Sequence, residues 1–267
     1  MTAAEKEKKL RDYLKRIKRL AVAFSGGVDS TYLLKVAYDE LGEGVTALTV
    51  AAAINPQREL KRASAMAAGW GIKHEIFGAE IDDIPKFSEN PPDRCYYCKH
   101  YLFSAFKEYC ASHDIDAIAD GSNIDDLQDH RPGHQALNEL GVISPLKECG
   151  FSKVEIRERS KELGLSTWDL PSCACLASRI PYDQTITLDK LKQIDSCEEL
   201  LFSFGFKIVR VRHHGDIARI EVGDREINRF SDRELRDNVS KAFKDYGFKY
   251  ITVDLTGYRT GSLNEGL

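Results

Sequence analysis

The sequence predicts an α/β fold with a doubly wound parallel sheet, followed by a smaller C-terminal α+β domain. Short apolar runs alternate with helical patterns over the first two-thirds of the chain, and a glycine-rich turn joins the first run to a long helix. Strands that alternate with helices form parallel βαβ units, whose sheet is covered on both faces. Two period-two runs around a tight turn near residue 215 indicate an antiparallel hairpin in the last third.

Each element of the first domain is predicted from a local pattern. The segment 1–20 carries apolar residues at helical spacing among charged ones, which predicts an amphipathic helix rather than a secretory signal. Strands are expected at 20–24, 45–52, 74–77 and 117–119, and helices at 29–41, 56–70, 96–113 and 153–163. The segment 121–150 is polar and has no pattern, and a loop of this length is usually functional.

The pattern changes near Pro181, which indicates a second domain. Helices are expected at 187–204 and 231–246, the strands of the hairpin at 207–212 and 217–222, and a last strand at 249–255. We therefore expect domains at 1–170 and 171–267, joined near 168–186.

The composition is that of an ordinary soluble protein. With 42% hydrophobic and 30% charged residues and a net charge of −4, the chain lacks the basic excess of a general nucleic-acid or membrane-surface binder. No apolar run reaches the roughly 20 residues that a membrane span needs. We expect a cytoplasmic protein whose partners are neither nucleic acid nor membrane. In the reducing cytosol its cysteines are expected to be metal ligands or reactive thiols rather than disulfides.

The glycine-rich turn at residues 25–30 follows the first predicted strand and opens the next helix. Its glycines let the backbone approach a phosphate, toward which the helix N-terminus directs N–H groups and a positive dipole end. Asp29 is placed to cap the helix or to help hold Mg²⁺. No lysine follows the glycines, so this is not a Walker A loop. The expected ligand contacts are Ser25, Gly26, Gly27, Asp29 and Ser30.

The string Ser-Gly-Gly-Val-Asp-Ser at these positions resembles the PP-loop of the ATP-pyrophosphatase family, also called adenine nucleotide α-hydrolase-like. The resemblance implies that ATP is cleaved between its α- and β-phosphates and that AMP is placed on a substrate. A loop that binds the leaving pyrophosphate stabilises the charge that develops on it.

Two cysteine pairs carry a second signal. Cys95 and Cys98 form a CxxC at the start of a predicted helix, where a thiolate is stabilised, and Cys173 and Cys175 form a CxC at the expected domain junction. Spacing alone leaves a structural zinc site, an iron–sulfur cluster and a metal-free pair of sulfur-carrying thiols open. The remaining cysteines are expected to be small buried side chains: Cys110, Cys149 and Cys197.

Arginines of the predicted hairpin are candidates for binding a substrate anion. Arg210 and Arg212 are two residues apart on a strand, so they project from one face, while Val209 and Val211 point to the core. Two neighbouring guanidinium groups form a good site for a phosphate or carboxylate. The same alternation of charge also describes a solvated strand face.

Polar residues elsewhere add further candidates. Gly121, Asp125 and Asp126 follow a predicted strand, at the end of the sheet where open α/β folds bind ligands. Gly121 and Asp125 are expected at the ATP site, and one of the two aspartates could help hold Mg²⁺, although acidic loop residues are usually solvated. Arg131 is either an anion contact or part of a structural turn. Arg179 is expected to contact the adenylated substrate.

These segments are together similar to the LarE family, the ATP-dependent sulfur transferases of nickel-pincer nucleotide cofactor synthesis. The similarity rests on the PP-loop, the two cysteine segments and residues 120–123, 130–133 and 209–214, and covers nearly the whole chain. It implies that the carboxylates of pyridinium-3,5-biscarboxylic acid mononucleotide are adenylated and converted to thiocarboxylates. Some members sacrifice the sulfur of one cysteine, whereas others carry several cysteines and a [4Fe–4S] cluster that delivers sulfide.

The cysteine-rich pattern favours the cluster-bearing kind. The resemblance implies Cys95, Cys98 and Cys175 as catalytic cysteines and cluster ligands, with one iron left for a transferable sulfide. Cys173 is either a fourth ligand, which would close that position, or a bystander thiol. If no cluster forms, Cys175 is the expected sacrificial donor. The resemblance also implies ATP and Mg²⁺ as cofactors, a separate sulfide donor, and a homo-oligomer.

Three other functions are compatible with the motifs. A PP-loop ligase with an amine nucleophile, like NAD or GMP synthetases, would use the cysteines as a structural zinc site. A tRNA-thiolating enzyme shares the mechanism, but the acidic charge and the lack of an evident tRNA-binding domain count against it. A zinc-stabilised nucleotide-binding or scaffold protein would bind ATP without turnover.

Overall fold

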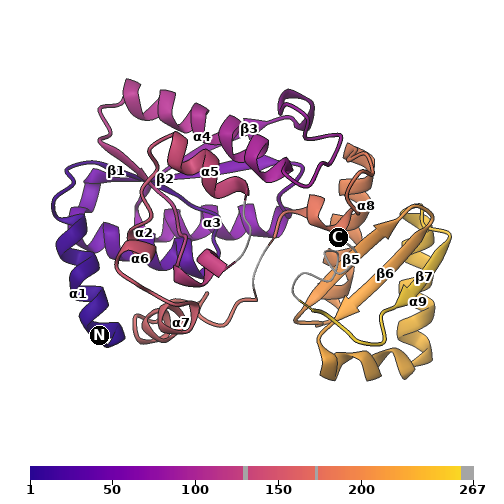
Figure 1. Cartoon of the computed structure of the whole chain (residues 1–267). Helices are drawn as coiled ribbons and strands as arrows, with labels where there is room; N and C mark the ends of the chain where they lie inside the picture. The colour runs from indigo at the N-terminus through magenta and orange to yellow at the C-terminus, as the bar shows by residue number, and fades with distance from the viewer. Residues whose placement is uncertain (129–131, 172–173, 260–267) are drawn as a thin grey trace. The chain divides into compact units, whose positions relative to one another are not determined.

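The computed structural model describes residues 1–128, 132–171 and 174–259 (Figure 1). The chain divides into two compact units, Met1–Lys86 with Asp93–Cys173 and Phe87–Pro92 with Ala174–Leu267. Within the described ranges, no helix is both long and apolar enough to cross a membrane. The predicted α/β class is confirmed, because a parallel sheet flanked by helices forms the first unit and a small mixed sheet belongs to the second.

The first unit is built on a four-stranded parallel sheet with strand order β3-β2-β1-β4. Its strands are β1 (Leu20–Ala23), β2 (Val45–Ala52), β3 (Lys73–Ala79) and β4 (Ala117–Ala119). Successive residues of a strand point to opposite faces, so Val22 joins one buried apolar cluster and Ala21 joins the other. The sheet is therefore covered on both sides, as the sequence predicts.

Helices from different parts of the chain form the two covering layers (Figure 1). One apolar cluster takes residues from α1 (Ala3–Leu14), α2 (Val28–Leu41), α3 (Gln57–Trp70) and α7 (Lys153–Glu162). The other takes residues from α4 (Arg94–Ser112) and α5 (Pro132–Glu139). Since β1 lies in the middle of the sheet, the turn that follows it opens between the two layers.

The segment 121–150 is not the irregular loop that its composition indicates. It contains α5, the short helix α6 (Pro145–Glu148) and a 3-10 turn at Ile124–Gln128. Helix α5 is only eight residues long, little more than two turns, and buries Gly133, Ala136 and Leu137. The prediction was wrong because short helices are stabilised by neighbours distant in sequence.

A buried carboxylate ties α1, α2 and α7 together. Glu7 accepts hydrogen bonds from the hydroxyl of Tyr32 (2.9 Å) and from Nε of Arg159 (2.7 Å) and Arg11 (3.0 Å). Burial alone would raise the pKa of Glu7, but these donors hold it below the ordinary 4.5. The first residue of α7 contacts the glycine-rich turn, so this ionic cluster also fixes that residue's helix.

The second unit contains the predicted hairpin. Strands β5 (Val209–His214) and β6 (Ile217–Val222) pair antiparallel, and β7 (Tyr250–Val253) lies parallel to β6. Helices α8 (Leu188–Ser203) and α9 (Arg233–Asp245) complete the core, in which Val209 and Val211 are fully buried.

A short segment from before α4 belongs to this second unit, which no sequence pattern indicates. Asn90 is fully buried and has a left-handed backbone, with φ of +59°. Its Nδ2 atom donates to the carbonyl groups of Ile180 (3.3 Å), Pro181 (2.7 Å) and Gln184 (3.2 Å). One amide side chain therefore holds the turn that leads into α8.

Replacing Asn90 by glycine keeps the left-handed backbone and removes these hydrogen bonds, so we expect the second unit to lose about 2 kcal/mol of stability. Faster amide hydrogen exchange in residues 180–200 measures this loss. The matched control is Asp183→Gly, because Asp183 is exposed and also has positive φ (+60°). Equal exchange in both variants would contradict the role of the amide.

Candidate functional site

In the glycine-rich turn of the first unit, backbone N–H groups donate to the side-chain hydroxyl groups of the same turn. Gly26 has φ of +71°, a conformation that glycine adopts without strain, and Gly27 is the N-cap residue of α2. The Oγ atoms of Ser25 and Ser30 lie 3.1 Å apart. The N–H groups of Ser25 and Gly27 point to this pair, at 3.3 Å from Ser30 Oγ and Ser25 Oγ respectively. Ser30 Oγ in turn donates to the carbonyl group of Gly27 at 3.3 Å. Converging N–H and O–H groups at the start of a helix suit a phosphate.

Asp29, in the first turn of α2, forms an ion pair with Nζ of Lys153. Burial raises the pKa of Asp29 above 3.8 although Lys153 opposes the shift, and the charge of Asp126 adds to the rise. The Nδ2 atom of Asn123 lies 3.5 Å from Asp29 Oδ1. Two carboxylates beside the glycine-rich turn form a donor set that fits Mg²⁺, which is usually held by one or two carboxylates and by substrate phosphates.

Gly121 and Asp125, both expected at the ATP site, lie beside the turn. A Cβ atom at Gly121 would be 3.0 Å from the backbone nitrogen of Ser30, so glycine is needed for the end of β4 to approach α2. Asp125 Oδ2 accepts the backbone N–H of Lys153 at 2.8 Å. Asp125 therefore positions the helix that carries Lys153.

Lys153 is the residue of this site that the sequence reasoning missed. It is the first residue of α7, after a capping box formed by Ser152 and Glu155. A cation at a helix N-terminus is unfavourable to the helix dipole. This unfavourable placement, directly after a strong helix start signal, is the pattern that could have identified it.

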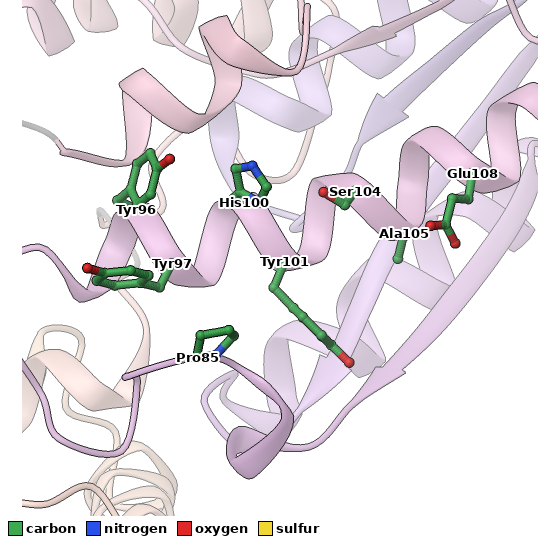
Figure 2. A pocket seen from close by; sticks show the side chains of 8 residues that line it. All are labelled: Pro85, Tyr96, Tyr97, His100, Tyr101, Ser104, Ala105 and Glu108. Carbon is green, nitrogen blue, oxygen red and sulfur yellow. The ribbon is translucent and has the colours of Figure 1, made fainter.

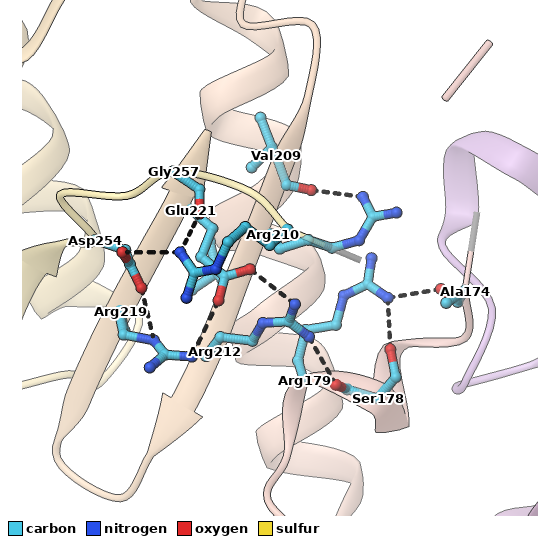
Figure 3. A network of polar contacts seen from close by, with 12 residues as sticks. Ala174, Ser178, Arg179, Val209, Arg210, Arg212, Arg219, Glu221, Asp254 and Gly257 are labelled. Atoms are coloured by element: carbon cyan, nitrogen blue, oxygen red, sulfur yellow. Dashed lines mark hydrogen bonds and ion pairs between the residues drawn. The ribbon is translucent and has the colours of Figure 1, made fainter. Parts of the chain in front are cut away.

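A buried network of arginines and glutamates occupies one face of the hairpin in the second unit (Figure 3). Arg179, Arg210 and Arg212 are at most 5% exposed. Arg179 makes two parallel hydrogen bonds to Glu198 (2.9 and 3.0 Å), and Arg212 donates to Glu221 (2.7 Å). The three expected arginines thus lie in one network, but they are buried rather than on a solvated strand face.

Arg179 also holds the backbone around Cys175. Its Nη1 atom donates to the carbonyl groups of Ala174 (2.7 Å) and Cys175 (3.1 Å) and lies 3.0 Å from Ser178 Oγ. Arg212 donates to the carbonyl group of Ser178 (2.9 Å). Two buried guanidinium groups thus fix the segment that carries the half-buried Cys175 thiol.

Arg210 is held differently from the other two arginines. Its Nη1 atom donates to the carbonyl group of Val209 at 2.7 Å, and its guanidinium group lies 5.1 Å from the ring centroid of Tyr258. In the hairpin register it faces Glu221. Among the described residues, the buried part of the network contains three guanidinium groups, of Arg179, Arg210 and Arg212, and two carboxylates, of Glu198 and Glu221.

Glu198, which organises this network, was not predicted. It is fully buried, accepts the N–H of Val211 as well as Arg179, and these partners hold its pKa below 4.5 although burial opposes them. It follows Ile194 by four residues, on the apolar side of α8. A carboxylate at such a position needs a buried partner, and this is the signal that the sequence contains.

The cysteine pairs are described only in part. Cys95 is exposed and Cys98 half-buried; they lie three residues apart in the first turn of α4, so both thiols project from one side. Cys95 and Cys98 belong to the first unit and Cys175 to the second, while Cys173 and Arg131 lie outside the described residues. Over the described ranges, no group of three His, Cys, Asp or Glu side chains is arranged to hold a metal ion.

The other three cysteines are buried, as expected. Burial raises the pKa of Cys110 to about 11 and also raises that of Cys149 and Cys197. Because the thiolate is the reactive form, burial disfavours reaction of these cysteines at neutral pH.

An open cavity of about 490 Å³ lies along α4 (Figure 2). Figure 2 shows Tyr97, Tyr101 and Pro85 around the same open space. None of the turn residues lines it. Its lining residues are Pro85, Tyr96, Tyr97, His100, Tyr101, Ser104, Ala105 and Glu108.

Comparison with known proteins finds full-length relatives. The chain is 40% identical over 258 residues to an uncharacterised protein of Synechocystis, covering 97% of this chain and 96% of the relative. It is 37% identical over 269 residues to the pyridinium-3,5-bisthiocarboxylic acid mononucleotide synthase of Lactiplantibacillus plantarum, covering 100% and 96%. An uncharacterised protein of Methanocaldococcus jannaschii is 31% identical over 262 residues, covering 94% and 96%. No protein-family model matches the chain.

Replacing Glu198 by glutamine leaves Arg179 without its carboxylate partner, so we expect a loss of about 3 kcal/mol in the second unit at neutral pH. Because the pKa of Glu198 is lowered in the folded state, its contribution is present above the unfolded value and disappears as the pH falls below about 4.5. Hydrogen exchange at neutral and acid pH measures the difference. Exposed Glu234 gives the control Glu234→Gln, and equal losses in both variants would contradict the assignment.

Proposed function

The chain belongs to the LarE family of pyridinium-3,5-bisthiocarboxylic acid mononucleotide synthases, and from this premise we propose that it is an ATP-dependent sulfur transferase. Its substrate is pyridinium-3,5-biscarboxylic acid mononucleotide, whose carboxylates it converts to thiocarboxylates for nickel-pincer cofactor synthesis. The observation that carries the proposal is the full-length similarity to a synthase of the bisthiocarboxylate. The glycine-rich turn and the segment around Cys175, which Arg179 and Arg212 hold by hydrogen bonds, supply groups suited to the two chemical steps.

The first step is adenylation of a substrate carboxylate. A carboxylate oxygen attacks the α-phosphorus of ATP, the bond to the β-phosphate oxygen breaks, and AMP remains on the carboxylate. The inward N–H and hydroxyl groups of the turn stabilise the charge that develops on the leaving pyrophosphate. The ammonium group of Lys153, paired with Asp29 of the turn, adds a cationic donor beside them. Mg²⁺, held by Asp29 and Asp126, would neutralise phosphate charge.

The second step replaces AMP by sulfur. A sulfur nucleophile attacks the acyl carbon, the bond from that carbon to the phosphate oxygen breaks, and AMP leaves with the electron pair. Adenylation is needed because a free carboxylate is a poor acceptor, whereas AMP is a good leaving group. A [4Fe–4S] cluster held by Cys95, Cys98 and Cys175 would supply the sulfide, which a separate sulfide donor replenishes. Arg179 and Arg212 fix the backbone on either side of the Cys175 thiol.

The arginine network supports binding of an anionic mononucleotide. Its buried part carries one more guanidinium group than carboxylates, since Arg179, Arg210 and Arg212 stand against Glu198 and Glu221. A buried excess of positive charge stabilises a phosphate or carboxylate, and charge-assisted hydrogen bonds from guanidinium groups are among the strong ones. We propose that this face of the hairpin binds the substrate.

The protein should release pyrophosphate only when the dicarboxylate mononucleotide, ATP and Mg²⁺ are all present, and AMP only when a sulfur source is present as well. Lys153→Gln removes the cation beside the leaving group, and we expect turnover to fall about 100-fold. The matched control is Lys161→Gln on the exposed side of the same helix, which should keep wild-type turnover. Release of ADP, or equal turnover in the two variants, would contradict this assignment.

Protein purified without oxygen should contain about four irons and four acid-labile sulfides per chain. Cys95→Ser and Cys175→Ser should each lose most of this iron, whereas Cys110→Ser, at a buried thiol, should retain it. Zinc without labile sulfide would refute the cluster. Loss of one sulfur from Cys175 during turnover, measured by protein mass, would assign the sacrificial route instead.

A further inference from the structure

The last peptide group before the glycine-rich turn is held from both sides by side-chain hydroxyl groups. The carbonyl oxygen of Phe24 accepts a buried hydrogen bond from Thr49 Oγ1 at 2.6 Å. On the other side, the N–H of Ser25 donates to Ser30 Oγ at 3.3 Å. The N–H of Phe24 still continues the sheet by donating to Leu48 (2.7 Å). The peptide between Phe24 and Ser25 is thus fixed in orientation where the chain leaves the sheet.

Thr49 is itself held by His74 on the neighbouring strand β3. The Nε2 atom of His74 lies 2.7 Å from Thr49 Oγ1. Because the hydroxyl hydrogen of Thr49 is donated to Phe24, its oxygen must accept, so the proton of His74 is on Nε2. Burial lowers the pKa of His74 below 6.5, which favours the neutral ring. A chain of hydrogen bonds therefore runs from β3 through β2 to the end of β1.

A second carbonyl group of the turn is held by α3. The oxygen of Gly26 accepts from Nε of Arg62 at 3.1 Å. Helix α3 also packs closely here, since a Cβ atom at Gly26 would lie 3.3 Å from Ala63 Cβ. The Nη2 atom of Arg62 is buried and has no hydrogen-bond partner in the described part of the chain. Arg62 thus anchors the outer side of the turn.

We propose that Thr49, His74 and Arg62 are positioning residues for pyrophosphate binding. The carbonyl and N–H groups of one trans peptide point in opposite directions. Holding the Phe24 and Gly26 carbonyls on outer donors therefore directs the N–H groups of Ser25 and Gly27 to the inner side, where the two serine hydroxyls lie. A carbonyl rotated inward would repel the phosphate and remove a donor. This inference rests on the proposed use of ATP.

The test measures binding of Mg²⁺ and α,β-methylene-ATP, which is not cleaved between those phosphates, by calorimetry. Thr49→Val keeps the shape of the side chain but loses its hydroxyl, so we expect about tenfold weaker binding. Thr49→Ser restores the hydroxyl and should bind within about twofold of wild type. Thr46→Val is the control, because Thr46 is also buried on β2 but pairs with Ala21 near the start of β1, far from the turn that follows this strand.

Unfolding midpoints are measured for the same proteins. A purely structural role would lower the midpoint of Thr49→Val and leave the affinity of the folded protein unchanged, which would overturn the proposal. Equal loss of affinity in Thr49→Val and Thr46→Val would overturn it as well. If the wild-type protein does not bind the analogue, the proposed ATP chemistry fails, and the positioning role fails with it.

A second series of variants tests the roles of His74 and Arg62. His74→Gln keeps an N–H donor for Thr49, whereas His74→Phe removes it, so only the phenylalanine variant should weaken binding, by about tenfold. Arg62→Ala should weaken binding to a similar extent. Wild-type affinity for the analogue in both His74→Phe and Arg62→Ala would contradict the proposal, because the peptide groups of the turn would then keep their orientation without these side chains.

Discussion

The peptide groups of the glycine-rich turn are oriented by side chains from the elements around it, and the first unit is organised about this turn. The turn follows the central strand of a parallel sheet, so elements on both sides can reach it. Thr49 and Arg62 receive its carbonyl groups, and Gly121 allows the end of another strand to approach. The ionic cluster around Glu7 anchors the helix that brings Lys153 to the same place. The conformation of the glycine-rich turn therefore depends on the whole sheet rather than on one motif.

The second unit depends on buried charge. Placing Glu198 and Glu221 in the interior is unfavourable unless each has a cationic partner, and Arg179 and Arg212 satisfy this condition. The same guanidinium groups bind carbonyl oxygens of the segment that carries Cys175. Such a network is weak evidence for stability, because hydrophobic residues of similar size can be as stabilising. Its consequence is a single defined position for that segment.

Local patterns allowed the fold class and the turn to be predicted. Alternating strands and helices determine a parallel sheet, and the residues from Ser25 to Ser30 lie in one short motif. Lys153, Glu198 and Asn90 were missed because their partners are far away in the sequence, and no spacing rule connects them. The burial of Arg210 and Arg212 could not be predicted from the alternation of charged and apolar residues, because the same alternation occurs in a strand with one solvated face. Helix α5 was not predicted because its eight residues are too few for a pattern to separate a helix from a loop.

Transfer of oxygen from substrate to AMP tests the central claim most directly. Dicarboxylate mononucleotide labelled with heavy oxygen in its carboxylates is incubated with the protein, ATP and sulfide, and the AMP is examined by mass spectrometry. If a carboxylate is adenylated and then attacked by sulfur, one labelled oxygen leaves with each AMP, and the product gains one sulfur in its place. Unlabelled AMP, or thiocarboxylate formed without AMP, would show that the sulfur is not introduced through an adenylate.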